Sequence, residues 1–179
     1  MADGAALALA ALAIGPAAAQ PAMPLERAVK AAFVYKFISY VEWPAQAFDT
    51  PDAPLVVGVV GSDPIAADLQ QIVAGRAVGE RPVLVKRWRE GESSDLHVLF
   101  VGRADVARLP AIQRSLAGQP TLIVTESPGA LGTGSMINLV VAPDGRVRFE
   151  VALDAAERSG LKLSSRMLAL AKAVRPGGS

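Results

Sequence analysis

The stretch LVVGVVGSDP, residues 55–64, decides the fold class. Its first six residues are apolar apart from one glycine, which is typical of a strand covered on both faces of a sheet. Gly61 and Ser62 then lead into a helix, for which the sequence predicts Asp63 as the capping residue and Pro64 in the first turn. A buried strand followed directly by a helix is the unit from which parallel sheets are built.

Strands and helices continue to alternate along the chain. The predicted strands are residues 55–60, 83–85, 96–101, 121–124, 136–141 and 146–151. The predicted helices are residues 25–43, 63–75, 104–116, 154–158 and 164–173. The last two strands flank Pro143-Asp144-Gly145, which is typical of a hairpin. We therefore expect an α/β fold: a three-layer α/β/α sandwich whose mostly parallel sheet of about six strands is closed by an antiparallel C-terminal hairpin.

The N-terminus departs from this globular pattern. Residues 5–19 are apolar and rich in alanine, and Gln20-Pro21 follows them. An apolar stretch of about 10 to 15 residues that ends in small residues is typical of a secretory signal, and it is too short to span a bilayer. Asp3 stands where such signals carry Lys or Arg, which leaves open an Ala-rich leader on a cytosolic protein. We expect a signal peptide over residues 1–19, a single domain over residues 25–175 and a periplasmic location.

Composition and charge exclude several functions. Eighteen Lys and Arg against 17 Asp and Glu give a net charge of +1, and hence no electrostatic basis for binding nucleic acid. Cysteine is absent, and the one histidine, His97, lies in an apolar strand, where a buried, hydrogen-bonded residue is more frequent than a metal ligand. No Gly-x-Ser-x-Gly motif presents a serine nucleophile. We expect no enzyme activity, catalytic residue, metal or cofactor; a hydrolase using Asp63 with Asp68, or Glu150 with Asp154, is the weaker alternative.

The order of the elements also predicts where a small ligand would bind. A parallel sheet offers a crevice at the carboxyl ends of its strands, where the chain leaves each strand for the next helix. Two such strand ends are Gly61-Ser62 and Gly102-Arg103. We therefore predict that Gly61, Ser62, Gly102 and Arg103 form a ligand site, if the protein is a small-ligand receptor.

Polar residues in and after the predicted hairpin indicate a surface for a protein partner. Arg148 and Glu150 alternate with apolar residues and fall on the face opposite Phe149. A solvated sheet face with a diagonal ion pair between them is the plainer interpretation. A polar rim around a transient interface is the other. The residues predicted to touch a partner are Arg148, Glu150, Asp154, Glu157 and Arg158, with Tyr35 and Trp43 from the aromatic-rich first helix. A homodimer through an unpaired edge strand is left open.

Four segments carry a resemblance to a known family. They are VKAAFVYKFISYVEWP (residues 29–44), MINLV (136–140), GRVRFEV (145–151) and GLKLSSRML (160–168). Together, and in this order, they resemble the YfiR family of small periplasmic proteins. The resemblance extends over essentially all of the chain that follows the predicted signal.

The resemblance implies a function that composition alone does not reach. It implies a periplasmic repressor that binds the sensor domain of a membrane-bound diguanylate cyclase, holds the cyclase inactive and so restrains cyclic-di-GMP signalling and biofilm growth. Some relatives carry cysteines that respond to redox state, and their absence here excludes that kind of control. The alternative is a periplasmic small-ligand receptor or adaptor for another membrane sensor, such as a histidine kinase.

Overall fold

The computed structural model describes residues 22–92 and 95–175, so the predicted signal peptide lies outside the described residues. The strands of the main sheet are β2 (Leu55–Val60), β3 (Ala77–Val78), β4 (Arg81–Arg87), β5 (Val98–Val101), β6 (Leu122–Thr125), β7 (Ile137–Val141), β8 (Val147–Ala152) and β10 (Ala173–Arg175). The helices are α1 (Ala22–Ile38), α2 (Asp63–Val73), α3 (Leu109–Ser115), α4 (Leu153–Arg158) and α5 (Ser165–Leu170). Short 3-10 turns are η1 (Ala45–Ala47), η2 (Val106–Arg108) and η3 (Ala130–Thr133), and a separate two-stranded sheet joins β1 (Val41–Glu42) to β9 (Lys162–Leu163).

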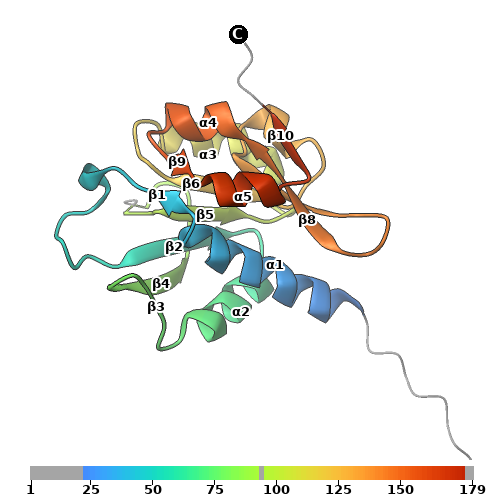
Figure 1. Ribbon diagram of the computed structural model, residues 1–179, viewed down its shortest axis with the longest axis horizontal. Helices are drawn as coiled ribbons and strands as arrows, with labels where there is room; N and C mark the ends of the chain where they lie inside the picture. Colours follow the sequence, from blue (N-terminus) through green and yellow to red (C-terminus); the bar gives the residue numbers. More distant parts are fainter. Residues whose placement is uncertain (1–21, 93–94, 176–179) are drawn as a thin grey trace, which may run out of the picture.

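The main sheet has the strand order β10-β8-β7-β6-β5-β2-β4-β3 and lies at the centre of the molecule (Figure 1). Strands β4, β2, β5, β6 and β7 run parallel, β7 and β8 form an antiparallel hairpin, and β10 runs parallel to β8. This confirms the predicted α/β class and the closing hairpin. The sheet has eight strands rather than about six, because the short strands β3 and β10 add its two edges.

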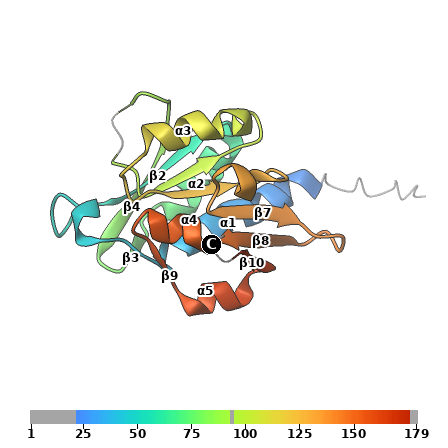
Figure 2. The ribbon, with the colours of Figure 1, turned by 90° about the horizontal axis from the view of Figure 1, so that it is seen from above.

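Both faces of the sheet are covered by helices. Along β5, Val98 and Phe100 belong to the apolar cluster beneath α1 and α2, whereas Leu99 and Val101 belong to the cluster beneath α3. Alternate residues of a strand point to opposite faces, so a strand with an apolar core on each side carries an uninterrupted apolar run. Figure 2 shows α3 on one side of the sheet, and the predicted three layers are present.

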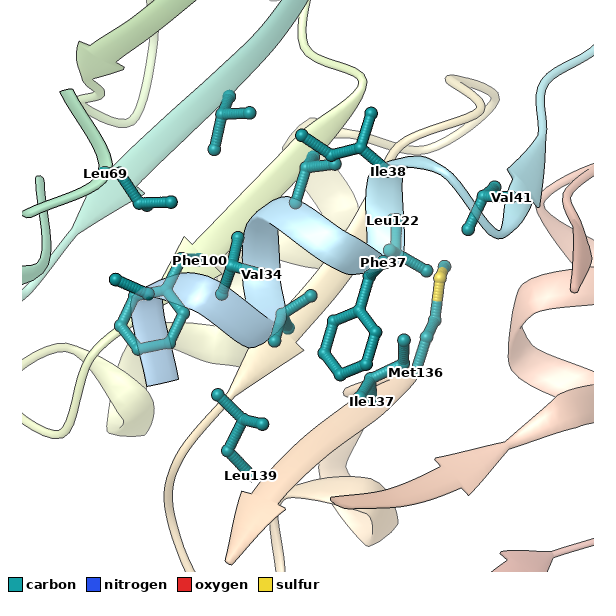
Figure 3. Close-up of a cluster of buried hydrophobic side chains, with 14 of the residues drawn as sticks. Val34, Phe37, Ile38, Val41, Leu69, Phe100, Leu122, Met136, Ile137 and Leu139 are labelled. Carbon is teal, nitrogen blue, oxygen red and sulfur yellow. The ribbon is translucent and has the colours of Figure 1, made fainter. Parts of the chain in front are cut away.

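The larger core forms where α1 crosses the sheet. Phe37 is 2% exposed, and its ring centroid lies 5.8 Å from that of Phe33 and 5.0 Å from that of Phe149 on β8. Figure 3 shows this ring beside Met136 and Ile137, with the neighbouring apolar side chains of α1 turned toward the sheet. Aromatic residues spaced four apart on one helix thus supply much of the contact between helix and sheet.

The first helix ends earlier than the sequence predicts. We expected a helix over residues 25–43, but α1 ends at Ile38 and β1 follows. Val41 pairs with Leu163 of β9, and the Tyr40 carbonyl accepts a hydrogen bond from the Ser164 amide at 2.9 Å. Pairing with a segment far along the chain therefore overrides the helical periodicity of residues 39–43.

The C-terminal helix is also shorter than predicted. Ser164 caps α5, with its hydroxyl accepting from the Met167 amide at 3.4 Å, but the helix ends at Leu170 rather than near Ala173. The Lys172 amide donates to the Phe149 carbonyl at 2.8 Å, which begins the pairing of β10 with β8. Pairing with the edge of the sheet therefore replaces the last predicted turn of this helix.

Two other helix starts differ from the prediction. Ser62, not Asp63, occupies the capping position of α2, and Asp63 is the first helical residue. The helix predicted from residue 104 begins as the 3-10 turn η2 and becomes α-helical only at Leu109. Within the described residues, every helix is too short or too polar to cross a bilayer.

Candidate functional site

A cavity of about 250 Å³ lies at the carboxyl ends of the central strands. It is lined by Glu26, Arg27, Lys30, Ser62, Pro64, Ile65, Arg103 and Glu126. The chain leaves β2 toward β4 on one side of the sheet and later returns to β5 on the other side, so loops after β2 and β5 diverge and leave a crevice. We call this cavity the switch-point crevice.

Two glycines bring the strand ends at this crevice together. Gly61 has a φ of 73°, in the left-handed region that glycine adopts readily. A Cβ atom on Gly102 would lie 2.3 Å from the Gly61 carbonyl oxygen, so no larger residue fits there without moving the backbone. Of the four predicted ligand residues, Ser62 and Arg103 line the crevice, whereas Gly61 and Gly102 do not line it but let the two strand ends approach closely.

A buried lysine lies in the wall of the crevice. Lys30 of α1 is 3% exposed, and its Nζ donates to Glu26 Oε1 at 2.5 Å and to Glu126 Oε2 at 2.7 Å. Glu126 directly follows β6 and its side chain is 12% exposed. Lysine is seldom buried unless it is paired, so these two carboxylates are what permits its position. This triad was not predicted from the sequence, although Glu26 and Lys30 have the spacing of an ion pair on one helix face.

The remaining charges of the crevice differ in how they are satisfied. Arg27 pairs with Asp68 of α2, with Nε and Oδ2 2.6 Å apart. Arg103 is exposed, and its guanidinium makes no ion pair or hydrogen bond with the described residues. The Ser62 hydroxyl does not cap α2, so the first amides of this helix are not satisfied by that side chain. At the rim of the crevice, Arg103 and Ser62 can therefore donate hydrogen bonds to a ligand. In its interior, the Lys30 ammonium group is already paired.

A second hollow, of about 410 Å³, adjoins the switch-point crevice and shares Arg103 and Glu126 with it. It extends along β7 and β8 to Asn138 and Glu150. Asn138 is buried, and its Oδ1 accepts hydrogen bonds from Thr125 Oγ1 at 2.7 Å and from the amide of Ser127 at 3.0 Å. These bonds hold the loop after β6, and with it Glu126, against the sheet. Glu150, predicted to touch a partner, thus lies beside the predicted ligand site.

The predicted partner residues fall into two groups. Arg148 pairs with Asp144 and Glu150 with Lys172, each with N and O 3.4 Å apart, so the diagonal Arg148–Glu150 pair does not form. The hairpin turn, where Asp144 lies, curls back toward Arg148 and competes for it. Both residues still lie on one face of the sheet, and Glu150 lies at the second hollow.

The second group lies on α4. Asp154 and Arg158 form an ion pair at 2.6 Å, which lowers the pKa of the Asp154 carboxyl, and Glu157 is exposed. Strand β8 ends opposite the start of β7, because the Ala152 amide donates to the Met136 carbonyl at 2.8 Å. Helix α4 therefore begins at the amino-terminal edge of the parallel strands, away from the crevice.

Tyr35 and Trp43 are both half-buried and both contact the chain itself. The Arg76 guanidinium lies 5.8 Å from the centroid of the Tyr35 ring. The Trp43 indole Nε1 donates to the carbonyl of His97 at 3.2 Å. Each ring keeps an exposed part, so each stays a predicted contact for a partner as well as a packing residue.

His97 is a buried, hydrogen-bonded residue, which confirms the prediction made for it. Its Nδ1 accepts from the Val56 amide at 3.1 Å, so the neutral ring carries its proton on Nε2, which lies 3.0 Å from the Ala47 carbonyl. The ring stacks on Phe48 with centroids 4.6 Å apart. Histidine thereby fastens η1 to the amino-terminal edge of the sheet. The described residues hold no cluster of three His, Cys, Asp or Glu side chains suited to a metal ion.

The buried histidine predicts a pH-dependent stability. Burial, and then the nearby charge of Arg81, lower the pKa of His97 below its ordinary value of 6.5, while the Ala47 carbonyl and Asp95 oppose this. The unfolded chain then binds the proton more readily, so the free energy of unfolding is expected to fall as the pH drops below about 6.5. In His97→Asn, the side-chain amide oxygen can still accept a hydrogen bond from the Val56 amide, but asparagine does not titrate. The loss of stability that comes from protonating His97 should therefore be absent in this variant. Urea unfolding at pH 7.5, 6.5, 5.5 and 5.0, values spaced around the ordinary pKa of histidine, measures the free energy of unfolding of both proteins. If it depends on pH in the same way in both, His97 is not the source of the pH dependence.

Comparison with known proteins places this fold in context. A family model described as YfiR/HmsC-like matches residues 27–172. A solved structure of a conserved domain protein from Vibrio cholerae O1 biovar El Tor str. N16961 is similar at a TM-score of 0.54 and 10% identity, over 83% of this chain and 60% of that one. The ABC domain in complex with L-Trp from Streptococcus pneumonia is similar at a TM-score of 0.50 and 11% identity, over 68% of this chain and 55% of that one. At these identities the two structures show the fold alone, and the chain spans less than two thirds of either.

Proposed function

Because this chain belongs to the YfiR/HmsC-like family, we propose that it binds the periplasmic sensor domain of a membrane-anchored diguanylate cyclase and restrains production of cyclic-di-GMP. The family consists of periplasmic regulators of cyclic-di-GMP signalling. The observation that carries the proposal is the extent of the match, residues 27–172, which includes every strand of the main sheet except β10. We propose both that the partner is a cyclase and that binding inhibits it.

The carboxylates support a regulator over a hydrolase. Each acid weighed for catalysis is held in an ion pair of its own: Asp63 with Arg87, Asp68 with Arg27, Glu150 with Lys172 and Asp154 with Arg158. A carboxylate that acts as a general acid or base must be free to exchange a proton with the substrate, whereas each of these four is already engaged with its own basic side chain. We therefore propose a protein without catalytic activity.

Removal of the protein tests this function in cells. Deletion of its gene is expected to raise cyclic-di-GMP and biofilm, because the cyclase loses its inhibitor. Tagged protein added to solubilised membranes should recover a cyclase, identified by mass spectrometry. Unchanged cyclic-di-GMP together with no recovered cyclase would contradict the proposal.

The two groups of predicted partner residues call for separate variants. Glu150→Lys changes the strand group and Arg158→Glu changes the α4 group, and both side chains lie at the surface. The variant at the true interface is expected to weaken binding to the sensor domain by at least about tenfold. The other variant then serves as its control, and both should keep the wild-type circular dichroism and melting temperature. Wild-type affinity in both variants would show that the interface lies elsewhere.

The switch-point crevice favours a second candidate function. It is a cavity at the place where this kind of sheet binds ligands, and charged side chains line it. We propose that the protein is a small-ligand receptor, acting on the cyclase or on another membrane sensor such as a histidine kinase. The similar ABC domain was solved in complex with L-Trp, which makes L-Trp a rational first probe. A rise in melting temperature with added metabolites tests this candidate, and no rise with any of them would contradict it.

A further inference from the structure

The charges around the switch-point crevice balance one another. Three bases and two acids line it, namely Arg27, Lys30 and Arg103 with Glu26 and Glu126. A third acid, Asp68, is not part of the lining but neutralises Arg27 through their ion pair. A ligand with a single charge would bring an unmatched ion into this partly enclosed space, and such an ion costs more there than in water. A ligand that carries both signs brings its own counter-charge and leaves this balance unchanged.

The two signs are not evenly mixed within the crevice. Lys30 is shared by Glu26 and Glu126, so these three side chains together carry one negative charge in excess. An ammonium group placed beside Glu126 would bring the number of cations up to the number of carboxylates. One end of the crevice therefore favours a positive group on the ligand.

The rim offers the opposite preference. The Arg103 guanidinium lines the crevice and makes no ion pair or hydrogen bond with the described residues. The Ser62 hydroxyl lines the same rim and is not spent on capping α2. A guanidinium and a hydroxyl can both donate hydrogen bonds to a carboxylate, which accepts them through its two oxygens.

The size of the cavity and its apolar wall limit the ligand further. Its volume of about 250 Å³ lies below the range of sites for drug-sized molecules. Pro64 and Ile65 of α2 supply apolar contact for a short hydrocarbon part. The crevice thus suits a molecule no larger than an amino acid.

We propose that the switch-point crevice binds a free α-amino acid, with its carboxylate at Arg103 and Ser62 and its ammonium group at Glu126. This inference rests on the receptor function proposed above and names its ligand class and site. The bound ligand would bridge α1, the start of α2 and the loops after β5 and β6.

Calorimetric titration of the full chain with single L-amino acids tests the ligand class. Each amino acid is compared with two analogues of matched shape, the acid without the amino group and the amine without the carboxylate. At least one amino acid is expected to bind saturably, and both of its analogues at least about tenfold more weakly. The backbone amide NMR signals of Gly61, Ser62, Gly102 and Arg103 should shift on binding.

Two variants and a control test the site. Arg103→Gln and Glu126→Gln are each expected to weaken binding at least about tenfold. Arg114→Gln, an exposed arginine of α3 outside the crevice lining, should bind as the wild type does. Arg103 is exposed and without an ion pair, so its variant is expected to fold even if Glu126→Gln does not.

The contrary outcomes separate this inference from the functions on which it rests. If a singly charged analogue binds saturably and no amino acid does, the proposed ligand class is wrong, but the receptor function still stands. Binding that Arg103→Gln and Glu126→Gln do not alter overturns the site. Absence of saturable binding by every amino acid up to about 10 mM overturns the inference, because affinities weaker than this fall outside specific recognition. Recovery of a cyclase from membranes depends on none of these results.

Discussion

Lys30→Met is expected to lower the free energy of unfolding by about 3 to 5 kcal/mol, as when one partner of a buried ion pair is removed. The side chain of Lys30 is 4% exposed, and its ammonium group is the cation that compensates both Glu26 and Glu126. Methionine fills a similar volume, so the loss comes from charge rather than from a cavity. The variant would leave two carboxylates facing each other, one of them nearly buried.

A double variant isolates the electrostatic part of this loss. Glu126→Gln in the Lys30→Met background removes the uncompensated buried charge and is expected to recover part of the stability. Urea unfolding of the wild type, both single variants and the double variant completes the cycle. An interaction energy near zero would show that the triad contributes only packing.

The Arg27–Asp68 pair provides a matched control. It also joins α1 to a neighbouring element, but the Arg27 side chain is 39% exposed. Water screens such a pair, so Arg27→Met is expected to cost less than about 1 kcal/mol. Equal losses at Lys30 and Arg27 would contradict the role assigned to burial.

Phe37→Ala is expected to cost about 3 to 5 kcal/mol of unfolding free energy, the range for removing a buried phenylalanine side chain. Phe37 lies at the centre of the larger core, between Phe33 on its own helix and Phe149 on β8. The deletion removes apolar contacts and leaves a cavity that a helix fixed to a sheet fills poorly. The measurement is the midpoint of thermal or urea unfolding.

An exposed apolar residue sets the scale for this result. Leu170 at the end of α5 is 68% exposed, so Leu170→Ala is expected to change stability by less than about 0.5 kcal/mol. A loss below about 1.5 kcal/mol in Phe37→Ala would show that the core repacks around the vacancy.

The place of the crevice was predictable from the sequence, and its chemistry was not. The apolar runs that become β2 and β5 identify their own carboxyl ends, and parallel neighbours bring such ends to one edge. Ser62 and Arg103, which line the cavity, are therefore predictable from the sequence. Lys30 and Glu126 are not, because they are 96 residues apart and meet only where α1 crosses the sheet beside β6.

The partner surface shows the same limit. Alternation along β8 correctly separates Arg148 and Glu150 from Phe149, because the pleat of a strand fixes which side chains share a face. The ion-pair partners of these two residues come from segments outside the strand. The hairpin turn places Asp144 beside Arg148, and the chain that enters β10 places Lys172 beside Glu150.

The sequence by itself determined the α/β class, the parallel strands with their closing hairpin and the buried state of His97, because apolar runs and periodicities act over a few neighbouring residues. Only the tertiary structure decided the ends of α1 and α5, the strands β1, β9 and β10, and the Lys30 triad. Each of these depends on contacts between distant segments of the chain, and such contacts stabilise the fold only after the sheet has brought the segments together.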